Sequence, residues 1–489
     1  LFERGVKLNV MALVDSAGFD AEALAKGVEL SDYDLKLGDL TELKRLFEHA
    51  TTFGSLIQVP EGLAAKLPAL KKLSEASSQD LFVTEALKRL GPLVQQAELL
   101  ATQYDAVVAN PPYMGSGGMN ASLKKLAKDN FPDAKSDLFA CFIERGFSLA
   151  NEAGHNAMVT MQSWMFLSSF EKMRERMLRE KTIRTMAHMS NGVMGIAFGT
   201  AATILRNREF PRYVSSYSHT SVDDLTAQRV PVEFPVRNDR LKQVAQDEFK
   251  KIPGSPVAYW VSDELRSVFA EGVPLRKLAD PKKGLATTDN DRFLRFWFEV
   301  SRRNLRIGCK DRNEASLSGA KWFPLNKGGG FRKWYGNKEY AINWAEDGRE
   351  LKAAVVERYG GGSYTKEIRS EDKYFRDGIT WSALTSSASS FRLTNYGALF
   401  DSAGSTMVPT GQEDSLLGLL NTPIVKTILA IINPTLNFGA GSVANIPVTL
   451  PNDPDISGHR VQEIVSSAKR DWDAYERSWD FQPLPLLTA

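Results

Sequence analysis

The sequence predicts an α/β protein with a doubly wound parallel sheet, followed by a second domain of mixed α+β character. Short apolar runs alternate with charged amphipathic runs between residues 104 and 205, as expected where strands alternate with helices. After about residue 210 the alternation becomes irregular, and Trp and Gly residues cluster. A content of 43% hydrophobic and 25% charged residues over 489 residues suits a globular protein of two or three domains.

The first hundred residues are predicted to be mostly helical. Residues 40–49 and 68–90 carry apolar side chains at three- and four-residue spacing among charges, and turn signals at Gly54 and at Pro60-Glu61-Gly62 separate them. We therefore expect a helical insertion at about residues 40–100.

The sheet is predicted to begin at Tyr104-Asp105-Ala106-Val107-Val108-Ala109, an apolar run that we expect to be a buried strand. Two prolines follow it, and proline cannot continue a sheet ladder, so the chain must enter a rigid loop. Helices are expected at residues 137–149 and 171–180, and further strands at 157–161, 183–189 and 201–205. In a sheet of this kind the ligand site lies beyond the carboxyl ends of the strands.

The overall charge is nearly balanced, but one segment is strongly basic. The chain has 61 Lys or Arg and 59 Asp or Glu, a formal net charge of +2. Residues 281–340 alone contain fourteen Lys or Arg against six Asp or Glu, a local balance of +8, together with several Trp. Such a segment suits a surface that faces phosphates and bases. A solvated basic face over ordinary core tryptophans is the other interpretation.

Other site classes find little support. Cys141 and Cys309 are too few for a disulfide framework, and the five histidines show no metal-ligand spacing. No apolar run reaches the roughly 18 to 20 residues of a membrane-spanning helix, and no signal-peptide pattern is found. We expect a cytoplasmic protein. The sequence starts at Leu1 without a capping or turn signal, and we expect that residues upstream of it are missing.

The most informative motif is Asn110-Pro111-Pro112-Tyr113, directly after the first predicted strand. An amino group conjugated to an aromatic ring is a poor nucleophile, because its lone pair is delocalised. The Asn110 side chain and the Pro111 carbonyl could accept both N–H hydrogens and direct the lone pair toward a methyl donor. Tyr113 would stack on the planar substrate. A simple turn that ends a strand is the other interpretation.

In its context this motif resembles motif IV of the S-adenosylmethionine-dependent N6-adenine DNA methyltransferases. Residues 137–149 and 158–166 are similar to the next helix and strand of that fold, and residues 195–200 fall near the family's segment that helps to hold the flipped base. The resemblance implies a Rossmann-like S-adenosylmethionine-dependent methyltransferase domain, which we assign to residues 1–210. We place the domain boundary at residues 207–235, a stretch that contains three prolines.

Later motifs resemble the target-recognition domain of the PglX-type methyltransferases of bacterial BREX phage-defence systems. They occur in the same order, at residues 284–293, 321–324, 326–337, 380–382 and 433–435. The resemblance implies a DNA target-recognition domain over residues 235–453. Residues 454–489 are expected to form a C-terminal helix and a proline-rich tail.

The implied activity is methyl transfer from S-adenosylmethionine to N6 of an adenine within a short sequence of double-stranded DNA, which marks host DNA. The adenine must leave the helix, because its amino group cannot be reached inside the stack. The catalytic residues would be Asn110, Pro111, Pro112 and Tyr113. The candidate substrate-binding residues are Phe198, Arg292, Lys327, Arg332, Lys333 and Trp334. For Phe198, an ordinary core aromatic position is the other interpretation.

Two family features are not found upstream of the motif, namely the glycine-rich cofactor loop and the acidic residue of the following strand. Asp39 is a candidate for a cofactor-binding carboxylate, although a helix N-cap explains it equally well. We therefore expect this chain to contain half of the cofactor pocket and to be the C-terminal portion of a larger enzyme. The isolated chain could then be inactive.

Two other functions stay open. Asn-Pro-Pro-Tyr also occurs in enzymes that methylate glutamine amides of release factors, but those enzymes are small and lack a long basic, aromatic second domain. The chain could also be a non-catalytic DNA-recognition fragment. Its possible partners include other BREX proteins and a phage inhibitor that mimics the charge of DNA.

Overall fold

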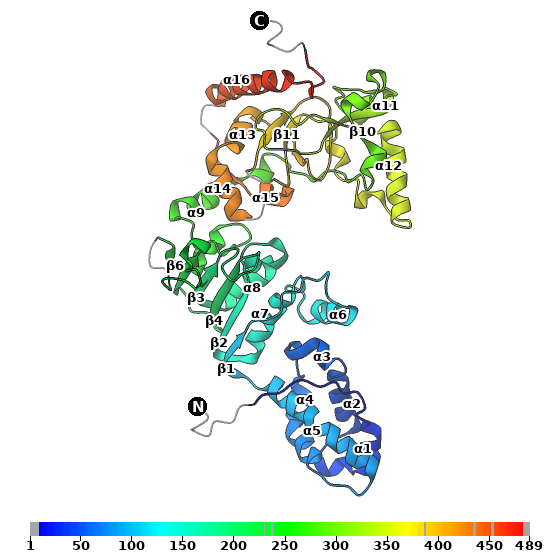
Figure 1. The fold of residues 1–489 in the computed structure, drawn as a ribbon, viewed down its shortest axis with the longest axis vertical. Helices are drawn as coiled ribbons and strands as arrows, with labels where there is room; N and C mark the ends of the chain where they lie inside the picture. The colour runs from blue at the N-terminus through cyan, green and yellow to red at the C-terminus, as the bar shows by residue number, and fades with distance from the viewer. Residues whose placement is uncertain are drawn as a thin grey trace. The chain divides into compact units, whose positions relative to one another are not determined.

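The computed structural model describes residues 9–228, 230–235, 239–385, 388–433, 437–450 and 454–482. By its internal contacts the chain divides into two compact units, Leu1–Lys250 and Lys251–Ala489 (Figure 1). The predicted boundary at residues 207–235 lies within the first unit, because the strands at Val214–Thr220 and Leu241–Ala245 extend the sheet of that unit.

A helical bundle forms the first part of unit 1. Its helices are α1 (Ala21–Gly27), α2 (Leu37–Leu46), α3 (Ala50–Phe53), α4 (Glu61–Ser74) and α5 (Leu81–Ala101). Leucines at three- and four-residue spacing on α4 and α5 are buried in a core that the bundle makes by itself. The segment predicted at residues 68–90 contains a break between α4 and α5, where the Asp80 side chain accepts hydrogen bonds from the first backbone N–H groups of α5.

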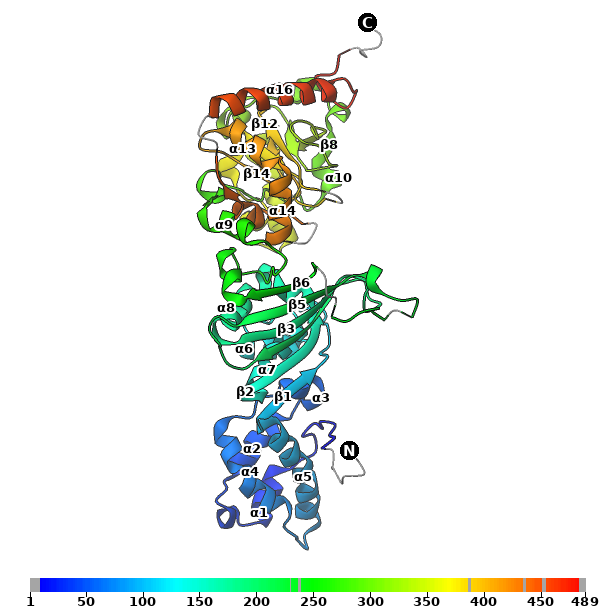
Figure 2. The same ribbon diagram turned by 90° about the vertical axis from the view of Figure 1, so that its left-hand side faces the viewer.

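The second part of unit 1 is a six-stranded sheet with the order β1-β2-β4-β3-β5-β6 (Figure 2). Its strands are β1 (Tyr104–Ala109), β2 (Ala150–Met161), β3 (Thr182–Met189), β4 (Thr200–Arg206), β5 (Val214–Thr220) and β6 (Leu241–Ala245). β1 pairs with β2, and β3 with β5, in parallel. β4 runs antiparallel to β2 and β3, and β6 runs antiparallel to β5.

The expectation of an all-parallel sheet is therefore wrong, and the connections explain why. A parallel pair needs a crossover, usually with a helix, whereas a short loop reverses the chain direction. The chain passes from β2 to β3 through α8 (Glu171–Glu180), which allows parallel strands. Between β3 and β4 it has only residues 190–199, which form neither helix nor strand.

Helix α7 (Leu138–Leu149) packs against β2 on one face of this sheet. Gly146 makes the close approach possible, since a Cβ atom at this position would lie 2.6 Å from the side-chain amide of the fully buried Asn156. Asn156 in turn donates a hydrogen bond to the Ile143 carbonyl of α7 at 2.9 Å. Arg145, also on α7, donates to the Ser55 and Leu100 carbonyls and so ties the sheet layer to the helical bundle.

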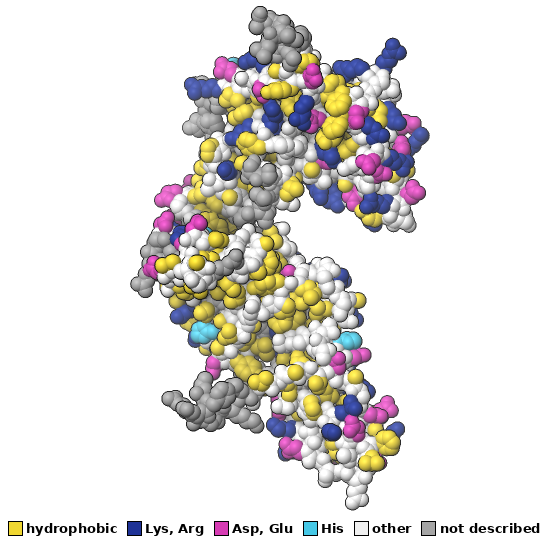
Figure 3. Space-filling view, viewed as in Figure 1, with side chains coloured by type: hydrophobic (Ala, Val, Ile, Leu, Met, Phe, Trp, Pro, Cys, Tyr) yellow, Lys and Arg dark blue, Asp and Glu magenta, His cyan; other side chains and the backbone are white. Residues whose placement is uncertain are grey.

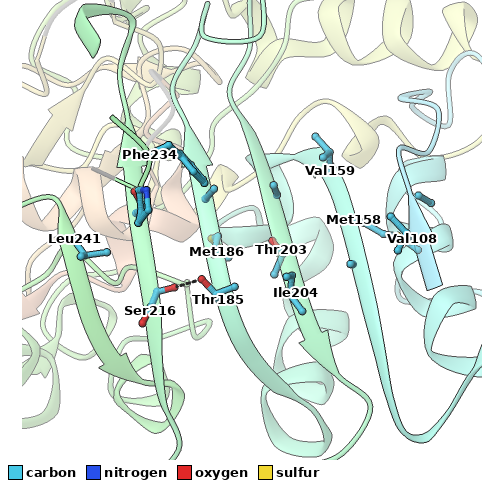
Figure 4. Close-up of a pocket in the computed structure, with 16 residues that line it drawn as sticks. Val108, Met158, Val159, Thr185, Met186, Thr203, Ile204, Ser216, Phe234 and Leu241 are labelled. Atoms are coloured by element: carbon cyan, nitrogen blue, oxygen red, sulfur yellow. Dashed lines mark hydrogen bonds between the residues drawn. The ribbon is translucent and has the colours of Figure 1, made fainter. Parts of the chain in front are cut away.

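The opposite face of the sheet is apolar and partly exposed. It holds a hollow of about 460 Å³ that is lined from β1 to β6 (Figure 4). In Figure 3, which has the view of Figure 1 and does not face this hollow, hydrophobic side chains gather over the sheet part of unit 1. Val108 of β1 is 78% exposed, so the expectation of a buried first strand is wrong. Among the described residues β1 pairs with β2 alone, and an apolar strand is buried only where a second layer covers it.

Unit 2 is built on two hydrophobic cores. One surrounds the sheet β13-β9-β10-β8, and the other lies between the sheet β12-β11-β14 and the C-terminal helices. The strands are β7 (Val273–Pro274), β8 (Leu294–Phe296), β9 (Trp322–Asn326), β10 (Tyr340–Asn343), β11 (Gly378–Trp381), β12 (Phe391–Thr394), β13 (Leu399–Phe400), β14 (Thr406–Met407) and β15 (Pro447–Val448). The helices are α9 (Asp263–Glu271), α10 (Asn290–Phe293), α11 (Arg312–Leu317), α12 (Ala345–Arg358), α13 (Glu413–Leu420), α14 (Pro423–Ile432), α15 (Ala440–Ala444) and α16 (Pro454–Asp473).

Within the described part of the chain, no single helix is long and apolar enough to cross a membrane. Helices α13 and α14 reach the required length and hydropathy only as a pair, and a bend of 71° separates them. Both contribute side chains to a core of unit 2.

The contact between α7 and β2 can be tested through Gly146. Gly146→Ala should lower the free energy of unfolding by about 1–3 kcal/mol, because the new Cβ overlaps the Asn156 amide. Gly62→Ala is the matched control, since a Cβ on this α4 glycine meets nothing within 4 Å, and it should stabilise the protein by about 0.5 kcal/mol. Urea unfolding of both variants measures the difference, and equal midpoints would contradict the close packing.

Candidate active site

The Asn110-Pro111-Pro112-Tyr113 loop leaves the carboxyl end of β1, as the sequence predicts. Two consecutive prolines fix their own φ angles and remove two N–H donors, so the strand ends and the loop is stiff. Asn110 is exposed, Pro111 is buried and Tyr113 is half-buried. The loop therefore presents the Asn110 side chain to solvent from a rigid base.

The Tyr113 hydroxyl joins this loop to the neighbouring strand. It lies 3.2 Å from the Val159 carbonyl of β2 and 3.2 Å from Oδ1 of Asn110. A phenol carries a single proton, so it serves one of these acceptors fully at a time. When the proton goes to Val159, Oδ1 of Asn110 is left to accept a hydrogen from another molecule.

Two aromatic rings pack against the ring of Tyr113. Phe139 of α7 lies 6.2 Å away at an interplanar angle of 88°, and Phe198 lies 5.7 Å away at 72°. Both contacts are of the edge-to-face kind that aromatic pairs favour. Burial raises the pKa of Tyr113, so the hydroxyl stays a hydrogen-bond donor at neutral pH. Asn110, Tyr113 and Phe198 are thus brought together, although 85 residues separate Tyr113 from Phe198.

Asp137 anchors the far end of the loop. Its Oδ1 atom accepts hydrogen bonds from Met114 N at 3.0 Å and from Phe139 N at 3.3 Å, so one carboxylate caps α7 and holds the loop. Leu138 N returns a hydrogen bond to the Met114 carbonyl. Burial raises the pKa of Asp137, and these backbone hydrogen bonds oppose that rise.

The structure contains only part of what a cofactor needs. The described residues before β1 form helices and their connections, so no strand with a glycine-rich turn precedes the motif in that stretch. Gly115, Gly117 and Gly118 follow the motif in a turn that Gly118 N closes onto the Gly115 carbonyl, and a Cβ at Gly117 would meet nothing within 4 Å. These glycines therefore shape a turn and do not form a close-fitting cradle.

Asp39 has a structural role in the bundle. Its Oδ2 atom accepts a hydrogen bond from Lys36 N at 2.8 Å, at the start of α2. α2 contacts α1, α4 and α5. The helix-cap interpretation therefore accounts for the contacts of this carboxylate.

The predicted substrate-binding residues of unit 2 all contact other parts of that unit. Arg292 pairs with Glu350 at 2.9 Å, Lys327 with the buried Asp401 at 3.0 Å, and Arg332 with Asp471 of α16 at 2.8 Å. Lys333 donates to the Asn421 carbonyl at 2.6 Å, and Trp334 is half-buried against a core of the unit. Of the motif at residues 433–435, only Asn433 lies within the described residues.

The basic segment is consequently less basic in three dimensions than along the sequence. The acids that neutralise it, such as Glu350, Asp401 and Asp471, lie outside residues 281–340. Lys338 is 2% exposed and sits over the rings of two tyrosines, and burial lowers its pKa far below the usual value. The cations that stay exposed without an ion pair in the described structure include Arg302, Arg303 and Lys310.

Several residues around the Asn110–Tyr113 loop could not be identified as site residues from the sequence. The Val159 carbonyl, Phe139 and the side chains of Gln162 and His188 all lie near the carboxyl edge of the sheet or contact residues there. A backbone carbonyl carries no residue-specific signal, and Phe139 falls within an ordinary apolar helix pattern. Only the fold identifies these groups.

Comparison with known proteins shows what this chain is similar to. The sequence profile of the Eco57I restriction-modification methylases matches residues 39–194, a range that includes the Asn110–Tyr113 loop. The adenine-specific methyltransferase BrxX of Escherichia coli O9:H4 (strain HS) is 37% identical over 99% of this chain. Over nearly its whole length the chain is thus similar to an adenine-specific methyltransferase. The PglX protein of Lacticaseibacillus casei (strain Zhang) is 32% identical over 96% of the chain.

The chain spans about two-fifths of the length of these relatives, 41% of BrxX and 40% of PglX. Among solved structures, the chain is similar to the Type IIL restriction-modification enzyme MmeI in complex with DNA. The identity is 13% and the TM-score is 0.46, and the match covers 96% of this chain and 72% of the MmeI chain. The chain is also similar to a nuclease-deletion mutant of the Type ISP restriction-modification enzyme LlaGI in complex with a DNA substrate mimic. The identity is 10% and the TM-score is 0.44, and the match covers 81% of this chain and 37% of the LlaGI chain.

The anchor at Asp137 is testable by hydrogen exchange. Asp137→Ala should speed exchange of the Met114 amide and lower the free energy of unfolding by about 1 kcal/mol, because α7 loses its cap and the loop its acceptor. Asp80→Ala removes a similar cap from α5 and should cost about the same stability without changing exchange at Met114. Unchanged Met114 exchange in Asp137→Ala would show that the loop is held by other contacts.

Proposed function

We propose that residues 1–489 contain the target-binding part of an N6-adenine DNA methyltransferase that uses S-adenosylmethionine and marks host DNA in a BREX-type defence system. The observation that carries this proposal is the rigid Asn110–Tyr113 loop at the carboxyl end of β1, with Oδ1 of Asn110 exposed next to two aromatic rings. The similarity to the BrxX and PglX adenine-specific methyltransferases supports it. Activity of the whole protein is part of the proposal, since the chain covers two-fifths of its relatives.

In this proposal the loop prepares the adenine amino group. Oδ1 of Asn110 and the Pro111 carbonyl accept its two hydrogens, so the nitrogen lone pair turns out of conjugation and becomes available for bond formation. Both acceptors are fixed in advance by the prolines and by the hydrogen bond of Tyr113 to Val159. The loop contributes orientation and hydrogen-bond acceptance, which can supply a large part of a catalytic effect.

The aromatic side chains hold the base. An adenine inside duplex DNA must be flipped out before its amino group can be reached, and a flipped base is usually bound by stacking on aromatic rings. Tyr113 supplies one such ring beside Asn110. Phe198 lies against Tyr113 and would contact the base at the edge of the Tyr113 ring.

S-adenosylmethionine supplies the methyl group when it is bound. The described residues of this chain do not form a complete cradle for it, because the stretch before β1 is helical and Asp39 caps a helix. We propose that residues outside 1–489 complete the cofactor pocket. The unpaired edge of β1 and the apolar open face of the sheet are the places where further structure could be added.

The second unit would recognise the DNA. Exposed cations such as Arg302, Arg303 and Lys310 are free to contact phosphates, which would position the duplex.

The incomplete cofactor cradle also leaves a second candidate function, in which this part of the protein alone acts as a DNA-recognition module. Other BREX proteins and a DNA-mimicking phage inhibitor are possible partners, and we propose a cytoplasmic location.

Asn110→Ala tests the catalytic assignment. In the full-length protein it should lower the rate of methyl transfer to DNA by about 100- to 1,000-fold, because one preorganised acceptor is lost, and it should leave DNA affinity nearly unchanged. Transfer of a tritiated methyl group to DNA from a strain lacking the gene measures the rate. Asn120→Ala, which removes the N-cap of α6 (Ala121–Asn130), is the control for truncating an asparagine in the same region. A wild-type rate in Asn110→Ala would refute the assignment.

The DNA-binding proposal predicts a steep salt dependence. The logarithm of DNA affinity should fall linearly with the logarithm of salt concentration, and Arg302→Ala or Arg303→Ala should each reduce the slope by about 0.9, the contribution of one phosphate contact. Arg349→Ala is the matched control, because this exposed arginine on α12 is already paired with Glu346. Fluorescence anisotropy with labelled duplex DNA measures the slopes. A flat salt response would exclude phosphate binding by this unit.

A further inference from the structure

Residues 190–199 form the loop that carries Phe198, and hydrogen bonds from His219 and Gln162 hold its two ends. The loop joins β3 to β4 without a helix or strand of its own. At its start, Ser190 Oγ lies 2.8 Å from Nε2 of His219, and Ser190 N donates to the Thr220 carbonyl at 3.0 Å. At its end, Gln162 N donates to the Gly199 carbonyl at 3.0 Å.

The side chain of Gln162 is itself fixed by His188. Nε2 of His188 lies 2.6 Å from Oε1 of Gln162, a short and direct hydrogen bond between a side chain of β3 and one of the turn that follows β2. His188 is 7% exposed, and its ring also lies near Phe166 and His219. Since an amide oxygen only accepts, Nε2 of His188 must carry the hydrogen in this contact. Burial, and secondarily His219, lowers the pKa of His188 to about 3, so the ring is neutral and keeps one tautomer throughout the neutral pH range.

Gly199 shows how closely the Gln162 amide approaches the loop. A Cβ atom at Gly199 would lie 2.4 Å from Oε1 of Gln162 and 2.7 Å from its Nε2, closer than any side chain could tolerate. Glycine at this position lets the amide of Gln162 rest on the backbone directly after Phe198. The Gln162 side chain therefore packs directly on the backbone next to Phe198, and the backbone of Gln162 bonds to Gly199.

We propose that Gln162 and His188 are positioning residues that hold Phe198 against Tyr113, so that this aromatic pair is correctly placed for the target base. Neither Gln162 nor His188 touches the base. His188 orients Gln162, Gln162 holds Gly199, and Gly199 holds Phe198 at 5.7 Å from Tyr113. The inference rests on the proposed function, because it presumes that this aromatic pair holds a flipped adenine.

Two substitutions of His188 test whether its hydrogen bond to Gln162 matters or only the burial of its side chain. Glutamine places an N–H donor near the position of the His188 Nε2 atom, whereas asparagine is shorter and reaches only the Nδ1 position. In the full-length protein His188→Gln should keep methyl transfer to DNA close to the wild-type rate. His188→Asn should lower kcat by about tenfold, since Gln162 then lacks its donor, and KM for DNA should change little. His155→Ala, on the strand β2 that precedes Gln162, is the control and should leave kcat unchanged.

A double-mutant cycle with Phe198 tests whether the effect passes through this ring. If His188 acts only by positioning Phe198, then His188→Asn should lower kcat by about tenfold in the wild type but by less than twofold in a Phe198→Ala background. Equal losses in both backgrounds, or no rescue by His188→Gln, would overturn the proposal. Asn110→Ala distinguishes a failure of the proposed function from a failure of the positioning role. If the proposed function is wrong, Asn110→Ala should stay active. If only the positioning role is wrong, Asn110→Ala should still lose activity.

Discussion

The parallel pairing of β1 with β2 is the constraint on which the site depends. It aligns Val108 with Ala157 and Ala109 with Met158, so both strands end at the same edge of the sheet. The Asn110–Tyr113 loop then leaves β1 beside the Val159 carbonyl and just before the turn that begins at Gln162. Because proline fixes the loop and Tyr113 bonds to β2, the direction of the Asn110 side chain is decided by the sheet and is not left to a flexible segment.

Further hydrogen bonds fix the other loops at the carboxyl edge of the sheet. Asp137 joins the far end of the loop to α7, and Gln162 and His219 hold the two ends of the loop that bears Phe198. Each of these residues is on a strand or at a helix terminus, where its backbone is already fixed. Tyr113 and Phe198 are therefore held in place before any substrate arrives, which reduces the entropic cost of binding a flipped base.

The sequence predicted well what local patterns determine. Helix α8, the extent of β1 and the cap of α7 by Asp137 follow from periodicity and capping, and the methyltransferase family follows from the motif in its context. The direction of β4 could not be predicted from the strand patterns alone, because it depends on the short connection between β3 and β4. The exposure of Val108 depends on which layers cover the sheet, and hydrophobicity carries no information on that point.

The net charge of the surface around residues 281–340 could not be predicted from the sequence either. The excess of +8 over residues 281–340 is a correct count, but the carboxylates that pair with Arg292, Lys327 and Arg332 come from later parts of the chain. Lys338 illustrates the extreme case, a lysine buried over two tyrosine rings. A local charge balance therefore indicates a DNA-binding surface only after the ion pairs of the fold have been taken into account.

The most direct test of the account is a map of N6-methyladenine in the DNA of cells with and without the gene. The account predicts methyladenine at one short, fixed sequence in cells that carry the intact gene, and no methylation of that sequence after its deletion. Identical maps in the two strains would contradict the claim that this chain is part of an adenine methyltransferase that marks host DNA.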